Sequence, residues 1–176
     1  MTTTTDGQLN QVDLGAVSAL VNKIRQRPSA AQTTWSAEVR WTGAFRSEAV
    51  IRGFAPIASD EPRGIGGTDQ APNPVEQLLG ALGNCLAVGY AISASVAGIT
   101  IRDLRIDVDG DLDLRAFLDL DPKTDRNAGF SAIRASVHLD TDADEAAEAE
   151  LHRKVAATSP VGHTLSRAVP VDISPA

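Results

Sequence analysis

Residues 74–97 read PVEQLLGALGNCLAVGYAISASVA, an apolar stretch whose only charged side chain is Glu76. Asn73 is a good N-cap, Pro74 suits the first helical position, and Glu76 follows the cap by three residues, as in a capping box. Gly98 is suited to end the helix. At about 1.5 Å per residue the predicted helix is roughly 36 Å long. A helix that is apolar nearly all round is buried on most faces, so the sequence predicts a long central helix that other elements cover.

The segments on either side of this helix carry helix and strand patterns. Apolar residues recur at three- and four-residue spacing over 13–27, which predicts an amphipathic helix. Apolar and polar residues alternate over 100–117 and 130–140, which is typical of an antiparallel sheet with one face on a core. In the second of these strands we expect four residues to face inward: Ile133, Ala135, Val137 and Leu139.

The remaining elements complete an α+β fold. We predict strands at 33–42, 46–54 and 169–173, loops at 58–72 and 120–129, a charged helix at 142–158 and a short helix at 159–168. This order differs from a regular βαβ series and predicts α+β rather than α/β.

The composition is that of one globular domain. The chain has 176 residues, of which 43% are hydrophobic and 22% are charged, enough to build a core. A net charge of −7 without any run of Lys or Arg argues against sequence-independent nucleic-acid binding, which needs a basic face. The first residues show no secretion signal, and the most apolar run, residues 78–97, is diluted by polar residues. We expect a soluble cytoplasmic protein without nucleic-acid or membrane partners.

Some short motifs resemble functional sites but are better explained by local structure. Residues 107–113, DVDGDLD, resemble a calcium loop, yet Leu112 and Leu118 stand where that loop needs Gly and Glu. The three histidines lie on separate predicted elements without ligand spacing, so neither a metal site nor a cofactor is expected. Ser159 and His163 are one helical turn apart, but the G-x-S-x-G elbow of a serine hydrolase is absent from the sequence, and Ser159 is interpreted as a helix cap.

Cys85 is the only cysteine of the chain, so no disulfide forms within it. A cysteine in an apolar helix is most often an inert core residue. The polar neighbour Asn84 and the nearby Arg63, Asp69 and Glu76 favour the alternative, a reactive thiol. A thiolate needs a cation close to it, and a carboxylate can hold that cation in place. From the residues alone, both interpretations stay open.

Glu76 and Cys85 cannot meet within one chain. They are nine positions apart on the predicted helix, which separates them by roughly 13 Å along its axis and about half a turn around it. If both belong to one site, a second copy of the helix must lie alongside in the reverse direction. An active thiol at this position therefore predicts a homodimer.

The motif NPVEQLLGALGNCLA, followed by GDLDLRAFLDL, GFSAIRASV, SPVGHTL and VPVDI, resembles the OsmC/Ohr family over residues 35–175. The resemblance implies an OsmC-like domain over 31–176, preceded by an N-terminal helical extension over 1–30. It also implies an intertwined homodimer, in which antiparallel sheets wrap the long central helices, and the reduction of organic hydroperoxides by a cysteine pair. Cys85 matches the first family cysteine, and Glu76 matches its glutamate, which some members carry one position earlier, at Val75. The family arginine matches Arg63, with Arg52 as the alternative.

This chain departs from the family at the second cysteine, where it has Ser159. A serine cannot form the disulfide that resolves a sulfenic acid. One hypothesis is therefore a single-cysteine hydroperoxide reductase that uses an external thiol. The alternative is a binding or redox-sensing dimer whose cavity holds a small apolar or acyl ligand, and a third possibility is a dimer without chemistry at the thiol.

Overall fold

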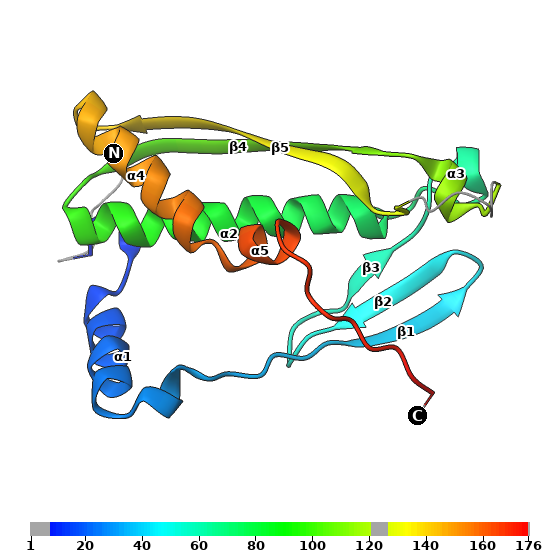
Figure 1. Ribbon diagram of the computed structural model, residues 1–176, viewed down its shortest axis with the longest axis horizontal. Coiled ribbons are helices and arrows are strands. Elements are labelled where there is room, and N and C mark those ends of the chain that lie inside the picture. Colours follow the sequence, from blue (N-terminus) through cyan, green and yellow to red (C-terminus); the bar gives the residue numbers. More distant parts are fainter. Residues whose placement is uncertain (1–7, 121–126, 176) are drawn as a thin grey trace. The chain divides into compact units, whose positions relative to one another are not determined.

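The computed structural model describes residues 8–120 and 127–175. It divides into two compact units, one formed by residues 8–12 and 79–175 and the other by residues 13–78. Each unit contains one antiparallel sheet, of strand order β1-β2-β3 in residues 13–78 and β4-β5 in the other unit. Figure 1 shows the elements: η1 (Leu9–Gln11), α1 (Leu14–Gln26), η2 (Pro28–Ala31), β1 (Glu38–Gly43), β2 (Arg46–Val50), β3 (Ile57–Ser59), η3 (Arg63–Ile65), α2 (Pro74–Ala97), β4 (Ile101–Leu112), α3 (Leu114–Phe117), β5 (Phe130–Thr141), α4 (Glu145–Thr158) and α5 (Pro160–Leu165). The α+β fold and the long helix are confirmed.

The unit that contains Cys85 is built on α2. The paired strands β4 and β5 run along this helix, and α4 packs against it (Figure 1). The buried core consists of Tyr90, Ala94, Ile99, Leu151 and Val155. Gly98 ends α2 with a φ of 75°, a left-handed conformation that glycine adopts readily. Small residues in α2 allow close packing, since a Cβ at Gly89 would lie 3.0 Å from the Val155 side chain.

The register of β4 and β5 confirms the alternation expected from the sequence. Leu104 lies opposite Leu139, and Ile106 opposite Val137, all on the half-buried face that packs on the core. Ala135 was expected to face inward and is exposed. It borders an open cavity of about 510 Å³, so no neighbour covers it.

The strand expected over 100–117 ends earlier, and this prediction is wrong over its last five residues. β4 stops at Leu112 because Asp113 caps α3, its carboxylate accepting a hydrogen bond from the Arg115 backbone N–H. A side chain that caps a turn offers the backbone an alternative to the strand ladder. Residues 121–126 of the loop expected at 120–129 lie outside the described residues.

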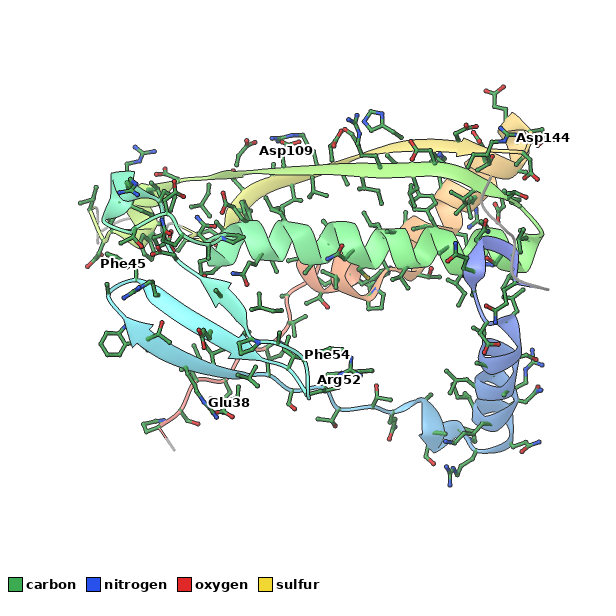
Figure 2. The ribbon with its side chains drawn as sticks, turned by 180° about the vertical axis from the view of Figure 1, so that it is seen from behind. Glu38, Phe45, Arg52, Phe54, Asp109 and Asp144 are labelled. Carbon is green, nitrogen blue, oxygen red and sulfur yellow. The ribbon has the colours of Figure 1, made fainter. Side chains whose placement is uncertain are left out.

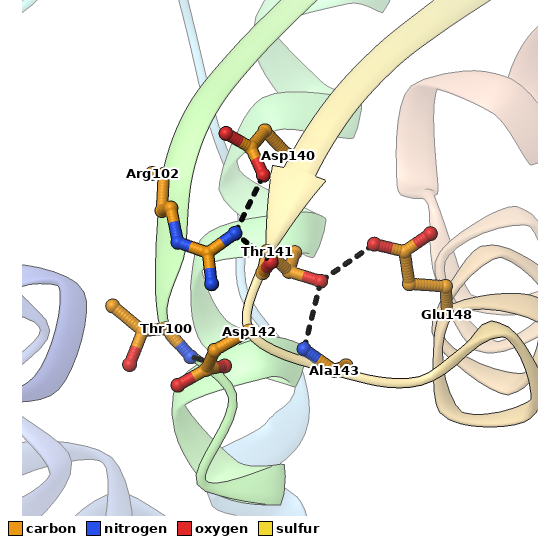
Figure 3. A network of polar contacts seen from close by, with 7 residues as sticks. All are labelled: Thr100, Arg102, Asp140, Thr141, Asp142, Ala143 and Glu148. Atoms are coloured by element: carbon orange, nitrogen blue, oxygen red, sulfur yellow. Dashed lines mark hydrogen bonds and ion pairs between the residues drawn. The ribbon is translucent and has the colours of Figure 1, made fainter.

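Figure 3 shows the polar contacts that fix the end of the β4–β5 pair to α4. Thr141 is buried, and its hydroxyl donates to the Glu148 carboxylate at 2.6 Å while accepting from the Ala143 N–H at 3.1 Å. Asp142 accepts from the Thr100 backbone N–H at 2.7 Å. These hydrogen bonds give partners to polar groups that would lower the stability of the fold if they were left unpaired at this turn.

Residues 8–12 contact the far end of α2. The Asn10 amide donates to Ser95 Oγ at 3.0 Å and to the Ile99 carbonyl at 2.9 Å, and its oxygen accepts from the Ile101 N–H at 2.8 Å. Asn10 adopts a φ of 51°, which asparagine tolerates better than most residues. The boundary expected at residue 30 stays a prediction.

The unit of residues 13–78 contains α1 and a three-stranded sheet. The predicted helix over 13–27 is confirmed, and Asp13 caps it by accepting from the Ala16 N–H at 2.9 Å. The strands expected at 33–42 and 46–54 are shorter than predicted, since β1 begins at Glu38 and β2 ends at Val50. The segment 58–72, predicted as a loop throughout, includes the end of β3 and the helical turn η3.

The strand expected at 169–173 is not formed. Val169, Val171 and Ile173 are exposed, and this segment has no paired strand among the described residues. A β-strand is stabilised by hydrogen bonds to a neighbouring strand, so an alternating pattern alone does not produce one.

By length and composition, α2 is long and apolar enough to cross a membrane, contrary to the expectation that no segment is. The most apolar 18-residue segment of α2 has a mean hydropathy of 1.5, and 28% of that segment is buried. The core helix of a globular protein meets the same criterion. The expected absence of a membrane partner stays a prediction.

Candidate functional site

Cys85 lies in the middle of α2, half-buried, with its sulfur beside a hydroxyl from a distant part of the chain. Its Sγ is 3.3 Å from Oγ of Ser159, which is 74 positions further along. An open cavity of about 560 Å³ adjoins the pair and is lined by Val88, Ile92, Val96, Ser93 and Lys154, among others. The thiol is therefore accessible from a largely apolar space, unlike a sulfur sealed inside a core.

Ser159 is the N-cap of α5, as the sequence predicts. The residue is 5% exposed, and its Oγ accepts a hydrogen bond from the Gly162 N–H at 3.1 Å. Pro160 occupies the first turn of α5, where its missing N–H costs nothing. The start of α5 thus places this hydroxyl against the sulfur of Cys85.

Glu76 forms the capping box that the sequence predicts. Its carboxylate accepts from the Asn73 N–H at 2.8 Å, and the Asn73 side chain accepts from the Glu76 N–H at 2.8 Å. Both Glu76 and Cys85 lie on α2, nine positions apart. A role for Glu76 beyond the start of the helix stays a prediction.

The two candidate arginines differ in what their side chains contact. The Arg52 guanidinium lies over the Phe54 ring, 4.7 Å from its centroid, in the loop after β2 (Figure 2). Arg63 lies in η3, where its backbone carbonyl accepts from the Gly66 N–H at 3.2 Å. Its side chain forms neither a hydrogen bond nor an ion pair with any residue in 8–120 or 127–175. Arg63 is therefore the candidate whose guanidinium is available to a ligand or to another chain.

A buried carboxylate that the sequence did not reveal fixes the loop that carries Arg63. Asp60 is 1% exposed and accepts from the N–H groups of Glu61, Thr68 and Gln70 and from the Thr68 hydroxyl at 2.5 Å. The Thr68 hydroxyl, followed by these backbone N–H groups, lowers the pKa of Asp60 to about 2. A carboxylate that accepts several hydrogen bonds stays ionised and rigidly held.

The same loop closes tightly at Gly67. A Cβ at this glycine would overlap the Glu61 backbone carbonyl. Asp69, considered from the sequence as part of the site, has a φ of 59° and donates its N–H to that carbonyl at 3.1 Å. Residues 63–69, RGIGGTD, are therefore an ordered turn.

Tyr90 and His152 form a second polar pair beside the core, which no sequence pattern signals. The Tyr90 hydroxyl lies 2.6 Å from His152 Nδ1, and the two rings meet edge to face. Burial raises the pKa of Tyr90, so its hydroxyl stays protonated, and it donates to Nδ1 in the neutral tautomer of His152 whose proton is on Nε2. The pair satisfies a buried hydroxyl at the α2–α4 contact.

The other motifs weighed in the sequence have structural partners. Arg134 on β5 pairs with Asp109 and Asp111, so the calcium-like run is an ion-paired sheet face. His163 Nε2 contacts the Ala157 carbonyl at 3.0 Å. No group of three or more His, Cys, Asp or Glu side chains suited to a metal ion occurs among the described residues. The expected absence of a metal and of a cofactor stays a prediction.

Solved structures with the same fold include several OsmC-like proteins. An OsmC-like protein from Mycoplasma pneumoniae has a TM-score of 0.66 and 20% identity, over 77% of this chain and 89% of that chain. The organic hydroperoxide resistance protein OsmC from Legionella pneumophila has a TM-score of 0.57 and 16% identity, over 76% and 91%. An organic hydroperoxide resistance protein from Elizabethkingia anophelis has a TM-score of 0.54 and 16% identity, over 75% and 89%.

At these identities the solved structures establish the fold and leave the activity open. Among curated proteins, none matches the chain significantly. The sequence itself matches the family described as OsmC-like protein over residues 67–174, which is more than half of the chain and includes Cys85 and Ser159. The chain therefore belongs to the OsmC-like protein family.

Proposed function

We propose that this protein reduces organic hydroperoxides with a single cysteine, Cys85, and an external thiol. The observation that carries the proposal is the position of its sulfur, half-buried beside Ser159 and open to an apolar cavity of about 560 Å³. An apolar cavity suits the organic part of a hydroperoxide, and a polar neighbour suits a charged sulfur. Membership of the OsmC-like family agrees with redox chemistry at this position.

The reaction proceeds in two stages. The Cys85 thiolate attacks the terminal oxygen of ROOH, the O–O bond breaks, and the alkoxide takes up a proton to leave as ROH. The sulfur is then a sulfenic acid. An external thiol R′SH attacks it, releasing water and forming a mixed disulfide, and a second R′SH releases R′SSR′ and restores the thiol. Ser159 cannot take the place of the external thiol, because a hydroxyl does not form a disulfide.

Arg63 and Glu76 are proposed to assist the first stage. In this proposal Arg63 stabilises the thiolate and the leaving oxygen, and Glu76 orients the guanidinium. The Arg63 side chain has no hydrogen-bond or ion-pair partner among the described residues, which supports Arg63 over Arg52, whose guanidinium is stacked on Phe54. An arginine that is not neutralised by an internal carboxylate can bind an anion at full charge.

We propose that the active form is a cytoplasmic homodimer. On α2, Val88 is 68% exposed and Val96 is 59% exposed. Trp41 in β1 is 76% exposed, and Trp35, just before this strand, is 78% exposed. Large exposed apolar side chains of this kind mark surfaces that another chain covers. A second α2 running in reverse would also bring Glu76 of one chain toward Cys85 of the other, which the spacing within one helix forbids.

The alternative proposal is that the same cavity binds a small apolar or acyl ligand and that Cys85 only senses oxidation. The mostly apolar lining of the cavity, with Lys154 at its side, favours this second candidate. In this proposal, replacement of Cys85 by serine leaves ligand-induced thermal stabilisation intact.

The decisive experiment is intact-mass analysis after one equivalent of cumene hydroperoxide, followed by peptide mapping. We expect rapid addition of one oxygen at Cys85 and its reversal by dithiothreitol. Met1 is the only other sulfur-containing residue, so mapping separates the two sites. Cys85→Ser should abolish both the addition and the dithiothreitol-dependent consumption of peroxide. A wild-type protein whose Cys85 stays reduced for an hour would refute the proposed reductase.

A further inference from the structure

The hydroxyl of Ser159 lies between two groups with which it can form hydrogen bonds. Its Oγ is 3.1 Å from the Gly162 backbone nitrogen and 3.3 Å from Cys85 Sγ, and the residue is only 5% exposed. The Gly162 N–H can only donate, so Oγ is the acceptor of that bond. The hydroxyl hydrogen is left for the sulfur.

The direction of the Ser159–Cys85 contact depends on the charge of the sulfur. A neutral thiol can donate or accept in such a pair. A thiolate has no hydrogen, so only O–H···S⁻ remains, and hydrogen bonds to charged acceptors are roughly twice as strong as neutral ones. Since Oγ already accepts from Gly162 N–H, this arrangement is set up for donation to an ionised sulfur.

We propose that the Ser159 hydroxyl is a catalytic hydrogen-bond donor that holds the Cys85 thiolate and, after oxidation, the sulfenate at the same place. The inference rests on the proposed hydroperoxide reductase and adds a residue to it. Among the described residues, no other side chain forms a hydrogen bond with the sulfur. In this proposal the Ser159 hydroxyl stabilises the sulfenate until the external thiol reacts with it.

This role explains why a hydroxyl serves at position 159 in a single-cysteine cycle. A resolving thiol there would consume the sulfenic acid within the chain by forming a disulfide and water. A hydroxyl leaves the sulfenic acid intact and donates to it. The sulfenic acid therefore persists until R′SH enters the adjoining cavity. Its lifetime should depend on the hydroxyl of Ser159.

The test measures how the rate of alkylation by iodoacetamide depends on pH, because only the thiolate reacts. We expect Ser159→Ala to lower the fraction of ionised Cys85 at pH 7 by tenfold to a hundredfold, the range expected for one bond to a charged group. Ser159→Thr keeps the hydroxyl and should restore the wild-type profile. Thr164→Ala is the matched control, since that hydroxyl on α5 donates to the Pro160 carbonyl and not to the sulfur.

Loss of the helix cap is separated from loss of the donor by a second variant. Ser159→Gly also removes the hydroxyl, but glycine is tolerated at an N-cap far better than alanine is. Both Ser159→Gly and Ser159→Ala should shift the alkylation profile, whereas a cap alone would change the melting temperature and leave the profile in place. An unshifted profile in the glycine variant overturns the inference.

The lifetime of the oxidised sulfur gives an independent readout. Dimedone labelling after one equivalent of cumene hydroperoxide should decay at least several times faster in Ser159→Ala than in the wild type. If Cys85 consumes peroxide and neither profile nor lifetime responds to Ser159, the inference fails while the reductase stands. If the alkylation profile shifts but the wild type does not react with peroxide, the reductase fails and the donor role is limited to the thiolate.

Discussion

Ser159→Cys should convert the Cys85–Ser159 contact into a disulfide. The present Sγ–Oγ separation is 3.3 Å, and an S–S bond is about 2.05 Å, so the side chains need to approach by roughly 1.2 Å. After oxidation by a hydroperoxide, the sulfenic acid at Cys85 condenses with the introduced thiol and releases water. The variant would then carry a resolving thiol within the chain.

The stabilisation can be worked out from the loop that the bond closes. The two positions are 74 apart, and chain-entropy theory gives about 4.5 kcal/mol for a loop of that length. Loss of the serine cap on α5 costs about 1 kcal/mol. The oxidised variant should therefore be about 4.5 kcal/mol more stable than its reduced form, which also lacks the cap, and about 3.5 kcal/mol more stable than the wild type. The first difference corresponds to a melting temperature higher by roughly 13 °C for a chain of this size.

The assay compares thiol titration, intact mass and thermal unfolding before and after one equivalent of cumene hydroperoxide. The wild type should not form the bond, and Ser93→Cys is the matched control. Ser93 lines the same cavity but lies eight positions after Cys85 on α2, roughly 12 Å along the axis, which is too far to bridge. Two free thiols in oxidised Ser159→Cys, with an unchanged melting temperature, would refute the reasoning.

Two further predictions concern stability. Asn10→Ala removes three hydrogen bonds at the end of α2 and should lower the free energy of unfolding by about 1.5–4 kcal/mol in urea titrations. Gln8→Ala is the neighbouring control. A loss under about 0.5 kcal/mol in Asn10→Ala would contradict the contacts described. The hydrogen bonds from Thr68 and the loop lower the pKa of Asp60 to about 2, whereas the pKa of an aspartate in the unfolded chain is about 4. The contribution of Asp60 to stability is therefore complete above about pH 4 and is lost as the pH falls toward about 2. In Asp60→Asn the stability should fall less steeply over that range than in the wild type or in Asp103→Asn, and equal slopes in the three proteins would count against this assignment.

The elements with strong local signals were predicted from the sequence alone. The helix α2, its Asn73–Glu76 capping box, the alternation of β4 and the capping role of Ser159 all depend on residues within a few positions of one another. Propensity, periodicity and capping act over such short distances, and for that reason the printed sequence contains them. It also contains a serine at position 159, where the resemblance to the OsmC/Ohr family implies a second cysteine.

Where local signals compete or a partner strand is required, the sequence was insufficient. The alternation over 100–117 continued past Leu112, but the Asp113 cap ended the strand there. The segment 169–173 alternates as a strand does, yet an isolated strand has nothing to satisfy its backbone groups.

The sequence by itself determined the long apolar helix, its start and the single sulfur upon it. Only the tertiary structure decided that the hydroxyl of Ser159 lies 3.3 Å from that sulfur, that Asn10 holds the end of the helix, and that Asp60 orders the loop of Arg63. The first and second of these join residues more than 70 positions apart, and the third depends on how a loop folds back on itself. Such contacts depend on packing between elements, which no pattern of neighbouring residues specifies.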